Sequence, residues 1–307
     1  MHTSYLQYMV EIERTRSITQ AAANLFLSQP NLSRILHEIE EQLGYAIFER
    51  SNRGVRPTEE GTAFLQHAKR ILSEMEAIES LGSGRRQPDR FRVCMPRSAG
   101  ILEMTVDYLN ALPEDQPLDA VLRECHVRQA LDYMAQGEID LAIIRYRAEY
   151  QDYFRDQAHG RQFRFEALNC YRYRVIMHRD NPVAQKGRIS VADLEGLPEI
   201  THGDTFRTRT GADGERRKRI YSVDRHAQLT LTTRIPGAFM WSTSVLPEDL
   251  AAWNLVQRDV EDNRVEYRNA LVSVAPELLN DIECRFLEFV RKRCHSQPAS
   301  ATPPYQK

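Results

Sequence analysis

The first third of the chain carries apolar residues at the spacing of a helix. From Leu32 to Leu43 they recur at steps of three and four, which places them on one helical face. A shorter helical pattern covers 17–25, and Ser28 and Pro30 mark the start of the second helix. Serine caps helix N-termini, and proline is tolerated in a first turn. The pattern predicts two helices joined by a tight turn, a candidate helix-turn-helix.

The other face of the second helix exposes polar side chains that can bond DNA. The predicted DNA-contacting residues on this helix are Gln29, Pro30, Asn31, Ser33, Arg34 and His37. Arg34 is the first candidate for a base or backbone contact in the major groove. Three acids follow, Glu38, Glu40 and Glu41. Because carboxylates repel phosphate, we expect only the N-terminal end of this helix to enter the groove.

Three arginines without an intervening acid follow the second helix. They are Arg50, Arg53 and Arg56, and the turn at 51–54 suits the tip of a hairpin. In a winged helix-turn-helix such a hairpin touches phosphates or the minor groove. A solvated surface loop is the alternative. Next to the predicted helix pair, we favour the wing.

A further helical pattern has the period of a coiled-coil seam. Apolar residues recur at steps of four and three over about two heptads. The predicted dimerisation residues are Phe64, Ala68, Ile71, Met75 and Ile78. The alternative is an amphipathic helix packed on its own domain. Dimerisation would hold two recognition helices at the spacing of the DNA helical turn.

Several linked motifs over about sixty residues resemble the LysR-type transcriptional regulators. They are AAA at 21–23, LSQPNLS at 27–33, IEEQLG at 39–44, FER at 48–50 and PTEEG at 57–61. The resemblance implies a DNA-binding winged helix-turn-helix, a dimerising linker helix and an effector domain like a periplasmic binding protein. It also implies a bacterial, cytoplasmic protein that commonly forms tetramers and reads an interrupted palindrome in promoter DNA.

From Phe91 onward, short apolar strands alternate with helical patterns, which favours βαβ units around a mainly parallel sheet. With the resemblance, the predicted fold class is α/β. An all-α winged helix-turn-helix and a long linker helix precede a two-lobed α/β effector domain of the type 2 periplasmic-binding-protein kind. The predicted parts are the DNA-binding domain 1–58, linker helix 59–81, hinge 82–90, effector domain 91–295 and flexible tail 296–307. Within the effector domain, lobe I comprises about 91–164 and 266–295, and lobe II about 165–265.

Two such lobes would leave a cleft at the carboxyl ends of their strands, beside helix N-termini that favour anions. The predicted effector-binding residues are Arg97, Ser98, Gly100, Arg128, Arg145, Thr201, His202 and Asp204. The resemblance implies that the Ser98 hydroxyl holds an effector carboxylate. Arg97 and Arg145 favour an anionic effector, and our hypothesis is a small carboxylate, aromatic acids included. Surface ion pairs are the alternative for each arginine. A second basic cluster at 207–219 is interpreted as a solvated face, with an anion site or an oligomer contact as alternatives.

Composition and charge narrow the function classes. The 307 residues are 42% apolar and 27% charged, which is typical of a globular protein and excludes a wholly disordered chain. No apolar run reaches membrane-spanning length and no secretory signal is visible, so we expect no membrane partner. Residues 1–90 hold 11 basic and 12 acidic residues, a net of −1. We therefore expect specific DNA binding to need at least a dimer.

The five cysteines are widely spaced and contain no CxxC motif, so neither a zinc site nor a disulfide framework is predicted. No HExxH, GxSxG, Walker or GxGxxG pattern occurs. We therefore predict no enzyme activity, no cofactor and no metal, in a reducing cytoplasm. The alternative function is a cysteine-based redox or ligand sensor with no specific DNA target, using Cys94, Cys125 or Cys170. Buried structural thiols are the simpler interpretation of these three.

Overall fold

The computed structural model describes residues 2–51, 54–81, 88–202, 218–245 and 247–295. The chain forms two compact units. One comprises 1–91 together with 115–120 and 131–140, and the other comprises 92–114, 121–130 and 141–307. The predicted flexible tail, and the predicted hinge apart from residues 88–90, lie outside the described residues.

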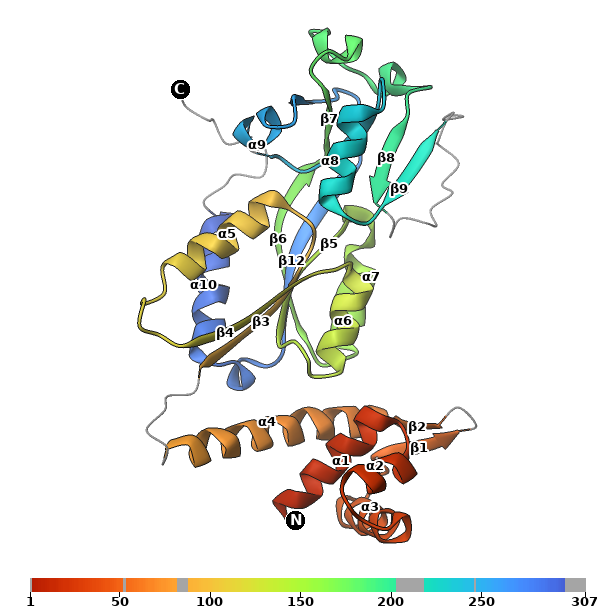
Figure 1. Cartoon of the computed structure of the whole chain (residues 1–307), viewed down its shortest axis with the longest axis vertical. Helices are drawn as coiled ribbons and strands as arrows, with labels where there is room; N and C mark the ends of the chain where they lie inside the picture. The colour runs from red at the N-terminus through yellow and green to blue at the C-terminus, as the bar shows by residue number, and fades with distance from the viewer. Residues whose placement is uncertain (1, 52–53, 82–87, 203–217, 246, 296–307) are drawn as a thin grey trace. The chain divides into compact units, whose positions relative to one another are not determined.

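The N-terminal part contains three helices, a hairpin and a long helix (Figure 1). The elements are α1 (Thr3–Thr15), α2 (Ile18–Asn24), α3 (Gln29–Leu43), β1 (Phe48–Ser51), β2 (Gly54–Pro57) and α4 (Glu59–Leu81). Strands β1 and β2 pair antiparallel at the place where the arginine-rich hairpin was expected. The module is therefore all-α apart from this two-stranded wing.

The core of this part unites α1, α3 and α4. The apolar face of α3, with Leu32 and Ile39, is buried in one cluster with Met9 of α1 and with Phe64 and Ala68 of α4. The prediction of Phe64 and Ala68 as dimer contacts is wrong, because the first turns of α4 cover the core of their own domain. Further along the same seam, Ile71 and Ile78 are exposed and Met75 is half-buried.

Helix α2 ends in a Schellman motif with an unusual residue. The Leu27 amide donates to the Ala22 carbonyl and the Phe26 amide to the Ala23 carbonyl, which is the hydrogen-bond pair of this motif. Phe26 therefore occupies the left-handed position, with φ 59°, where glycine is usual. Its ring is 97% exposed. The left-handed backbone at Phe26 is strained, and the exposed ring makes no buried contacts that would offset this strain.

We expect Phe26→Gly to raise the unfolding free energy of the N-terminal part by about 0.5–1 kcal/mol. Gly44→Ala is the matched control of opposite sign, because Gly44 ends α3 at φ 78° and an added Cβ would meet nothing within 4 Å. Gly44→Ala should lower the unfolding free energy of the N-terminal part by about 1 kcal/mol. Hydrogen exchange in peptides from residues 2–51 measures both. A loss of protection in Phe26→Gly would show that the ring makes stabilising contacts.

The rest of the chain builds two five-stranded sheets (Figure 1). The first has the order β4 (Leu118–Glu124), β3 (Asp89–Met95), β5 (Leu141–Arg147), β12 (Glu266–Ser273) and β6 (Arg164–Arg172). The second has the order β11 (Leu255–Arg258), β7 (Arg174–His178), β10 (Phe239–Ser242), β8 (Glu199–His202) and β9 (Arg219–Ser222).

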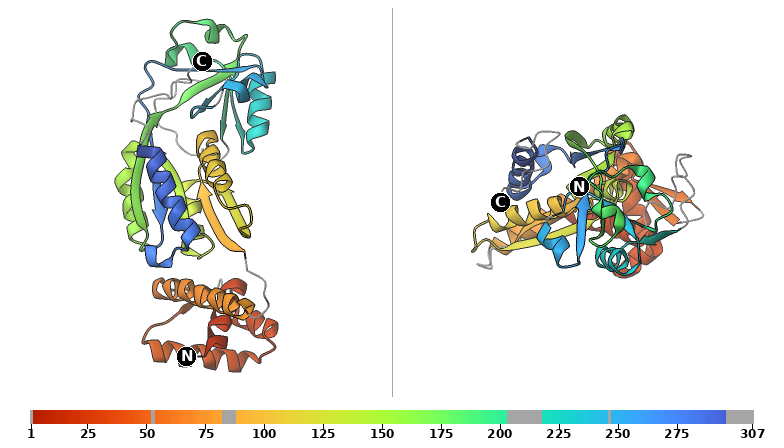
Figure 2. Two further views of the ribbon diagram at one scale, coloured as in Figure 1. Left: turned by 90° about the vertical axis from the view of Figure 1, so that its left-hand side faces the viewer. Right: turned by 90° about the horizontal axis from the view of Figure 1, so that it is seen from above.

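The helices of this part are α5 (Ala99–Asn110), α6 (Val127–Ala135), α7 (Gln151–His159), α8 (Arg225–Arg234), α9 (Pro247–Ala251) and α10 (Asp281–His295). Short 3₁₀ turns lie at Ala148–Tyr150, Pro182–Gln185, Val191–Leu194 and Pro276–Leu278. Helices α5 and α10 pack together beside the first sheet (Figures 1 and 2), where the Tyr108 ring meets Phe286. Helices α6 and α7 lie on the other side of this sheet (Figure 1).

Two expectations about the sheets need correction. Both sheets are mixed rather than mainly parallel, because β12 runs antiparallel to β5 and β6, and β7 antiparallel to β10 and β11. The predicted lobe boundary at residue 165 is also too early. Strand β6 pairs with β12 in the first sheet, so the chain crosses to the second sheet between β6 and β7. A strand that enters its sheet from the neighbouring lobe, as β7 and β12 do, runs antiparallel to the strands beside it, which accounts for the mixed sheets.

Candidate functional site

The exposed side of α3 presents the polar residues expected to contact DNA. Helix α3 begins at Gln29 with a proline in its first turn. Gln29, Pro30, Arg34 and His37 are exposed, and Asn31 and Ser33 are half-buried. The Gln29 side-chain amide donates to the Ser33 hydroxyl over 2.8 Å. These groups can exchange such local bonds for bonds to a nucleic acid, because all of them reach solvent.

Arg34 is the most prominent cation of this surface. Its side chain is 65% exposed, and Nη1 lies 2.6 Å from Glu38 Oε1. Its Nη2 donates to the Asn31 side-chain oxygen over 3.1 Å. The guanidinium therefore lies along its own helix and must turn outward to reach a base.

Glu40 has a structural task, which corrects the interpretation of it as a repelling acid. Its carboxylate Oε1 accepts hydrogen bonds from the backbone amides of Ile47 and Phe48 at 2.7 and 3.1 Å. These bonds join the end of α3 to the start of the hairpin. The charge is therefore held at the base of the wing rather than on the exposed face of α3.

The wing is fixed to α1 by its backbone. The Val55 amide donates to the Arg16 carbonyl over 3.0 Å. Arg56 on β2 is exposed and lies opposite Glu49 in the hairpin register. Arg50 lies on β1, opposite Val55, and Arg53 lies outside the described residues. Among the described side chains of the three predicted wing arginines, that of Arg56 is exposed and available to DNA.

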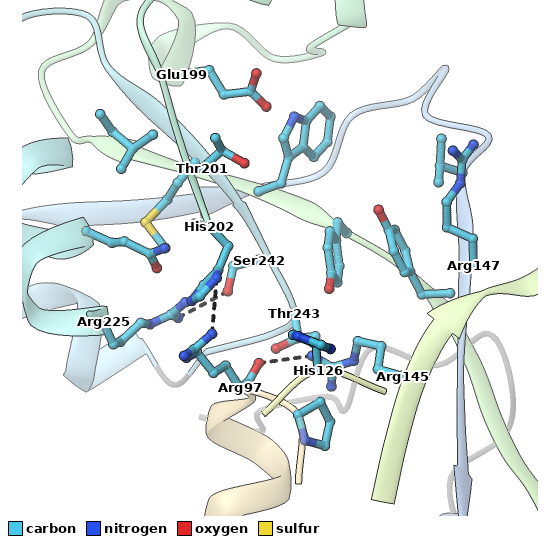
Figure 3. A pocket seen from close by; sticks show the side chains of 18 of the residues that line it. Arg97, His126, Arg145, Arg147, Glu199, Thr201, His202, Arg225, Ser242 and Thr243 are labelled. Carbon is cyan, nitrogen blue, oxygen red and sulfur yellow. Dashed lines mark hydrogen bonds between the residues drawn. The ribbon is translucent and has the colours of Figure 1, made fainter. Parts of the chain in front are cut away.

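A pocket of about 580 Å³ is lined by residues of both sheets and of the segments that connect them (Figure 3). Its cations are Arg97, Arg145, Arg147, Arg219 and Arg225. Its aromatic residues are Tyr173, Tyr221, Trp241 and Tyr267, with His126 and His202. Its other polar residues include Glu199, Thr201, Gln228, Ser242, Thr243 and Asn263. This volume suits a small molecule.

Half of the predicted effector-binding residues line this pocket: Arg97, Arg145, Thr201 and His202. Ser98 precedes α5, and its hydroxyl lies 3.4 Å from the Thr243 hydroxyl at the pocket wall. Gly100 and Arg128 are exposed and do not line the pocket, because both lie inside helices and face outward there. Asp204 lies outside the described residues.

Arg147, Arg219 and Arg225 are the pocket cations that the sequence analysis missed. Arg147 follows Arg145 by two residues on β5, and strand alternation could have placed both on one face. Arg219 belongs to the cluster interpreted as solvated, although it forms a cross-strand ion pair of 3.0 Å with the buried Glu199. Arg225 begins α8, and no local pattern links that helix to β5.

Arg97 and His202 connect the first sheet's loop to the second sheet. Arg97 Nη1 lies 3.0 Å from His202 Nδ1, and His202 Nε2 lies 2.9 Å from the Val223 carbonyl. A guanidinium only donates, so Nδ1 accepts and Nε2 carries the proton. His202 is therefore neutral in this arrangement.

Arg145 is held by neutral groups. Its Nε donates to the buried Asn269 side chain over 3.1 Å, and its Nη1 to the Arg97 carbonyl over 3.0 Å. The guanidinium carbon lies 5.1 Å from the centre of the Tyr171 ring, a cation–π distance. These contacts fix the direction of the guanidinium without neutralising it.

Half-buried tyrosines lie on this side of the pocket, with Tyr173 and Tyr267 among its lining residues. The Tyr173 and Tyr267 rings stack at 4.0 Å with 15° between their planes. Burial raises the pKa of Tyr267 to about 12 and the pKa of Tyr171 well above its ordinary value. Both phenols are therefore neutral near pH 7.

The cysteines give the redox alternative little support. None of the five, all of which lie in the described ranges, forms a disulfide, and Cys125 lines the pocket but is buried. Of the three candidate sensors, Cys94 and Cys125 are buried, and the half-buried Cys170 thiol donates to the Glu266 carboxylate over 3.7 Å. Burial of a thiol limits its access to an oxidant. In the described ranges no cluster of three metal-ligating side chains occurs, and no helix there is long and apolar enough to cross a membrane.

Comparisons with known proteins agree with the architecture. Residues 3–62 match the family described as "Bacterial regulatory helix-turn-helix protein, lysR family". A putative HTH-type transcriptional regulator, PtxE of Stutzerimonas stutzeri, is 30% identical over 64% of this chain and 93% of its own length. The HTH-type transcriptional regulator GbpR of Azospirillum brasilense is 28% identical over 68% of this chain, and the match spans only 60% of GbpR.

A solved structure shows the same fold over nearly the whole chain. It is the full-length LTTR LysG from Corynebacterium glutamicum with bound effector Arg. It superposes with a TM-score of 0.64 at 14% identity and covers 96% of this chain and 99% of its own. The family match at residues 3–62 and the 30% identical relative show that this chain belongs to the LysR family of bacterial helix-turn-helix regulatory proteins.

Proposed function

We propose that this protein is a transcription regulator that binds specific promoter sequences in double-stranded DNA. The observation that carries the proposal is the exposed N-terminal half of α3, with Arg34, beside a wing with Arg56. The apolar side of α3 is buried in its own domain, so its polar side is the one available to the major groove.

Affinity selection of sheared genomic DNA on the purified full-length protein tests this proposal. The expected result is enrichment of a few promoter fragments that carry an interrupted palindrome. Enrichment no greater than that on an unrelated protein of similar net charge would contradict it. The selection is done at moderate salt, where non-specific phosphate contacts are weakened.

We propose that a small anionic effector, a carboxylate in the simplest case, controls DNA binding from the pocket. Five arginines face this pocket, and Glu199 is the carboxylate among its lining residues. LysG carries the amino acid Arg as its effector. A cation of that kind would be repelled here, so we expect an effector of opposite charge.

We propose self-association to a dimer, and to a tetramer, for the DNA-bound protein in a bacterial cytoplasm. Ile71 and Ile78 on α4 are exposed at heptad-like spacing. A second exposed apolar group lies on α5 and the edge strand β4: Leu102, Val106 and Leu122. Two separate apolar surfaces would allow one dimer contact through each, as a tetramer requires.

A further inference from the structure

Two arginines of the pocket lack an acidic partner among the described residues. Arg145 bonds to an amide oxygen and a backbone carbonyl, and no described carboxylate lies within ion-pair distance. Arg225 Nη2 donates to the Ser242 hydroxyl over 3.1 Å, again without a described carboxylate at that distance. A half-buried guanidinium without a carboxylate in direct contact is unfavourable, so each of these two sites favours an anion.

The two cations lie apart within one pocket. Figure 3 shows Arg225 and Arg145 on two sides of the pocket, with Arg97 between them. Arg145 belongs to β5 of the first sheet and Arg225 to α8, which packs on the second. Burial lowers the pKa of Arg225; the negative charge of Glu124 opposes this shift, and the positive charge of Arg145 adds to it. The two charges therefore act on each other, which a single anion at one end would relieve only in part.

The carboxylates near the pocket supply only part of the negative charge that the two cations need. Glu124 acts on Arg225 from beyond ion-pair distance and lies 3.9 Å from Arg97. Glu199 is already paired with Arg219, and Arg147 has Glu149 at 3.1 Å. The Tyr171 and Tyr267 phenols stay protonated, because burial raises the pKa of both. What the tyrosines offer is a flat, aromatic surface, since the Tyr173 and Tyr267 rings stack and both line the pocket.

We propose that the ligand of this pocket is an aromatic compound with two separate anionic groups, one bound at Arg145 and the other at Arg225. The ring lies against the tyrosine pair, where a planar group gains stacking contacts. The proposal rests on the proposed function in taking this pocket as the effector site. It specifies two charges where a simple carboxylate would bring one.

The test measures binding of defined probes to the full-length protein by calorimetry. The probes are the three benzenedicarboxylates, and each has as matched control its monoamide, the carbamoylbenzoate of the same geometry. At least one dicarboxylate should bind about tenfold or more tightly than its monoamide, because it makes one more charge-assisted bond. Phenyl phosphate, with both charges on one group, should bind less tightly than that dicarboxylate.

Variants separate charge recognition from folding. Arg145→Gln and Arg225→Gln should each remove the preference for the dicarboxylate over its monoamide. Arg188→Gln is the control, because Arg188 is 85% exposed and is not a pocket residue. Arg145→Lys and Arg225→Lys keep the charge and should keep the preference, so a loss confined to the Gln variants cannot come from misfolding.

Three results would overturn the inference: a monoamide that binds as tightly as its dicarboxylate, phenyl phosphate as the tightest probe, or no binding of any dicarboxylate at millimolar concentration. The DNA selection is independent of these outcomes. Enriched promoters without dicarboxylate binding would reject the ligand class and keep the regulator. Dicarboxylate binding without enriched DNA would reject the regulator and keep the ligand class.

Discussion

Replacing Arg34 by alanine in the full-length protein should weaken binding to a selected promoter by about 10- to 100-fold. A bidentate arginine contact to a base is worth about 1–3 kcal/mol of discrimination, and Arg34 is the exposed arginine of the described α3. The loss should be largest for the promoter sequence and small for unrelated DNA. Fluorescence anisotropy with both duplexes at one salt concentration measures it.

Arg14→Ala is the matched control for Arg34→Ala. Arg14 is also 65% exposed and also pairs with a glutamate on its own helix, Glu11, but it lies on α1. It should leave promoter affinity within about twofold of the unaltered protein. Equal losses in the two variants would show that Arg34 acts through general charge and would contradict its role in reading sequence.

Gly61→Ala should unfold or loosen the N-terminal part, at a cost of about 3 kcal/mol or more. A Cβ at Gly61 would lie 1.8 Å from the Ile47 carbonyl oxygen and 2.7 Å from its carbon. These are backbone atoms, and the same oxygen accepts the Thr58 amide at 3.0 Å. Helix α4 would therefore have to move away from the hairpin and would lose the burial of Phe64 and Leu65.

Two measurements show whether the effect of Gly61→Ala is limited to the N-terminal part. Hydrogen exchange should increase in peptides from residues 2–81, while the fluorescence of Trp241 and Trp253, the two tryptophans of the chain, stays unchanged. Gly100→Ala is the control, because its added Cβ would meet nothing within 4 Å. It should leave stability unchanged or raise it by at most about 1 kcal/mol. Normal protection in Gly61→Ala would refute the close contact.

The N-terminal module could be predicted from sequence because its signals are local. The apolar spacing of α3 and the start signals at Ser28 and Pro30 act within a few residues. The role of Gly61 was not visible, since it depends on the backbone of Ile47 approaching α4. The heptad-like spacing of α4 was visible, but periodicity alone does not say what covers a face. Phe64 and Ala68 were therefore assigned to a partner although they pack on their own domain.

The pocket shows the same division between local and long-range information. Arg97 follows β3 and Arg145 lies near the end of β5 in the same sheet, and both were predicted at the cleft. Arg225 lies on the other lobe, after a stretch whose strands pair in an order that the sequence does not reveal. Gly100 and Arg128 were misplaced because a residue near the start of a helix can point toward the cleft or away from it. The side that faces the cleft depends on packing that composition does not encode.

Sequence-specific binding through two α3 helices is tested with three versions of a selected promoter. Full-length protein is titrated against the native fragment and against fragments with about half a helical turn (about 5 base pairs) or about one turn (about 10 base pairs) inserted between the half-sites. A symmetric regulator that places two α3 helices in successive major grooves should lose affinity with the half-turn insert. It should regain part of that affinity with the full turn. Equal affinity for all three fragments would contradict specific binding by two α3 helices in successive major grooves.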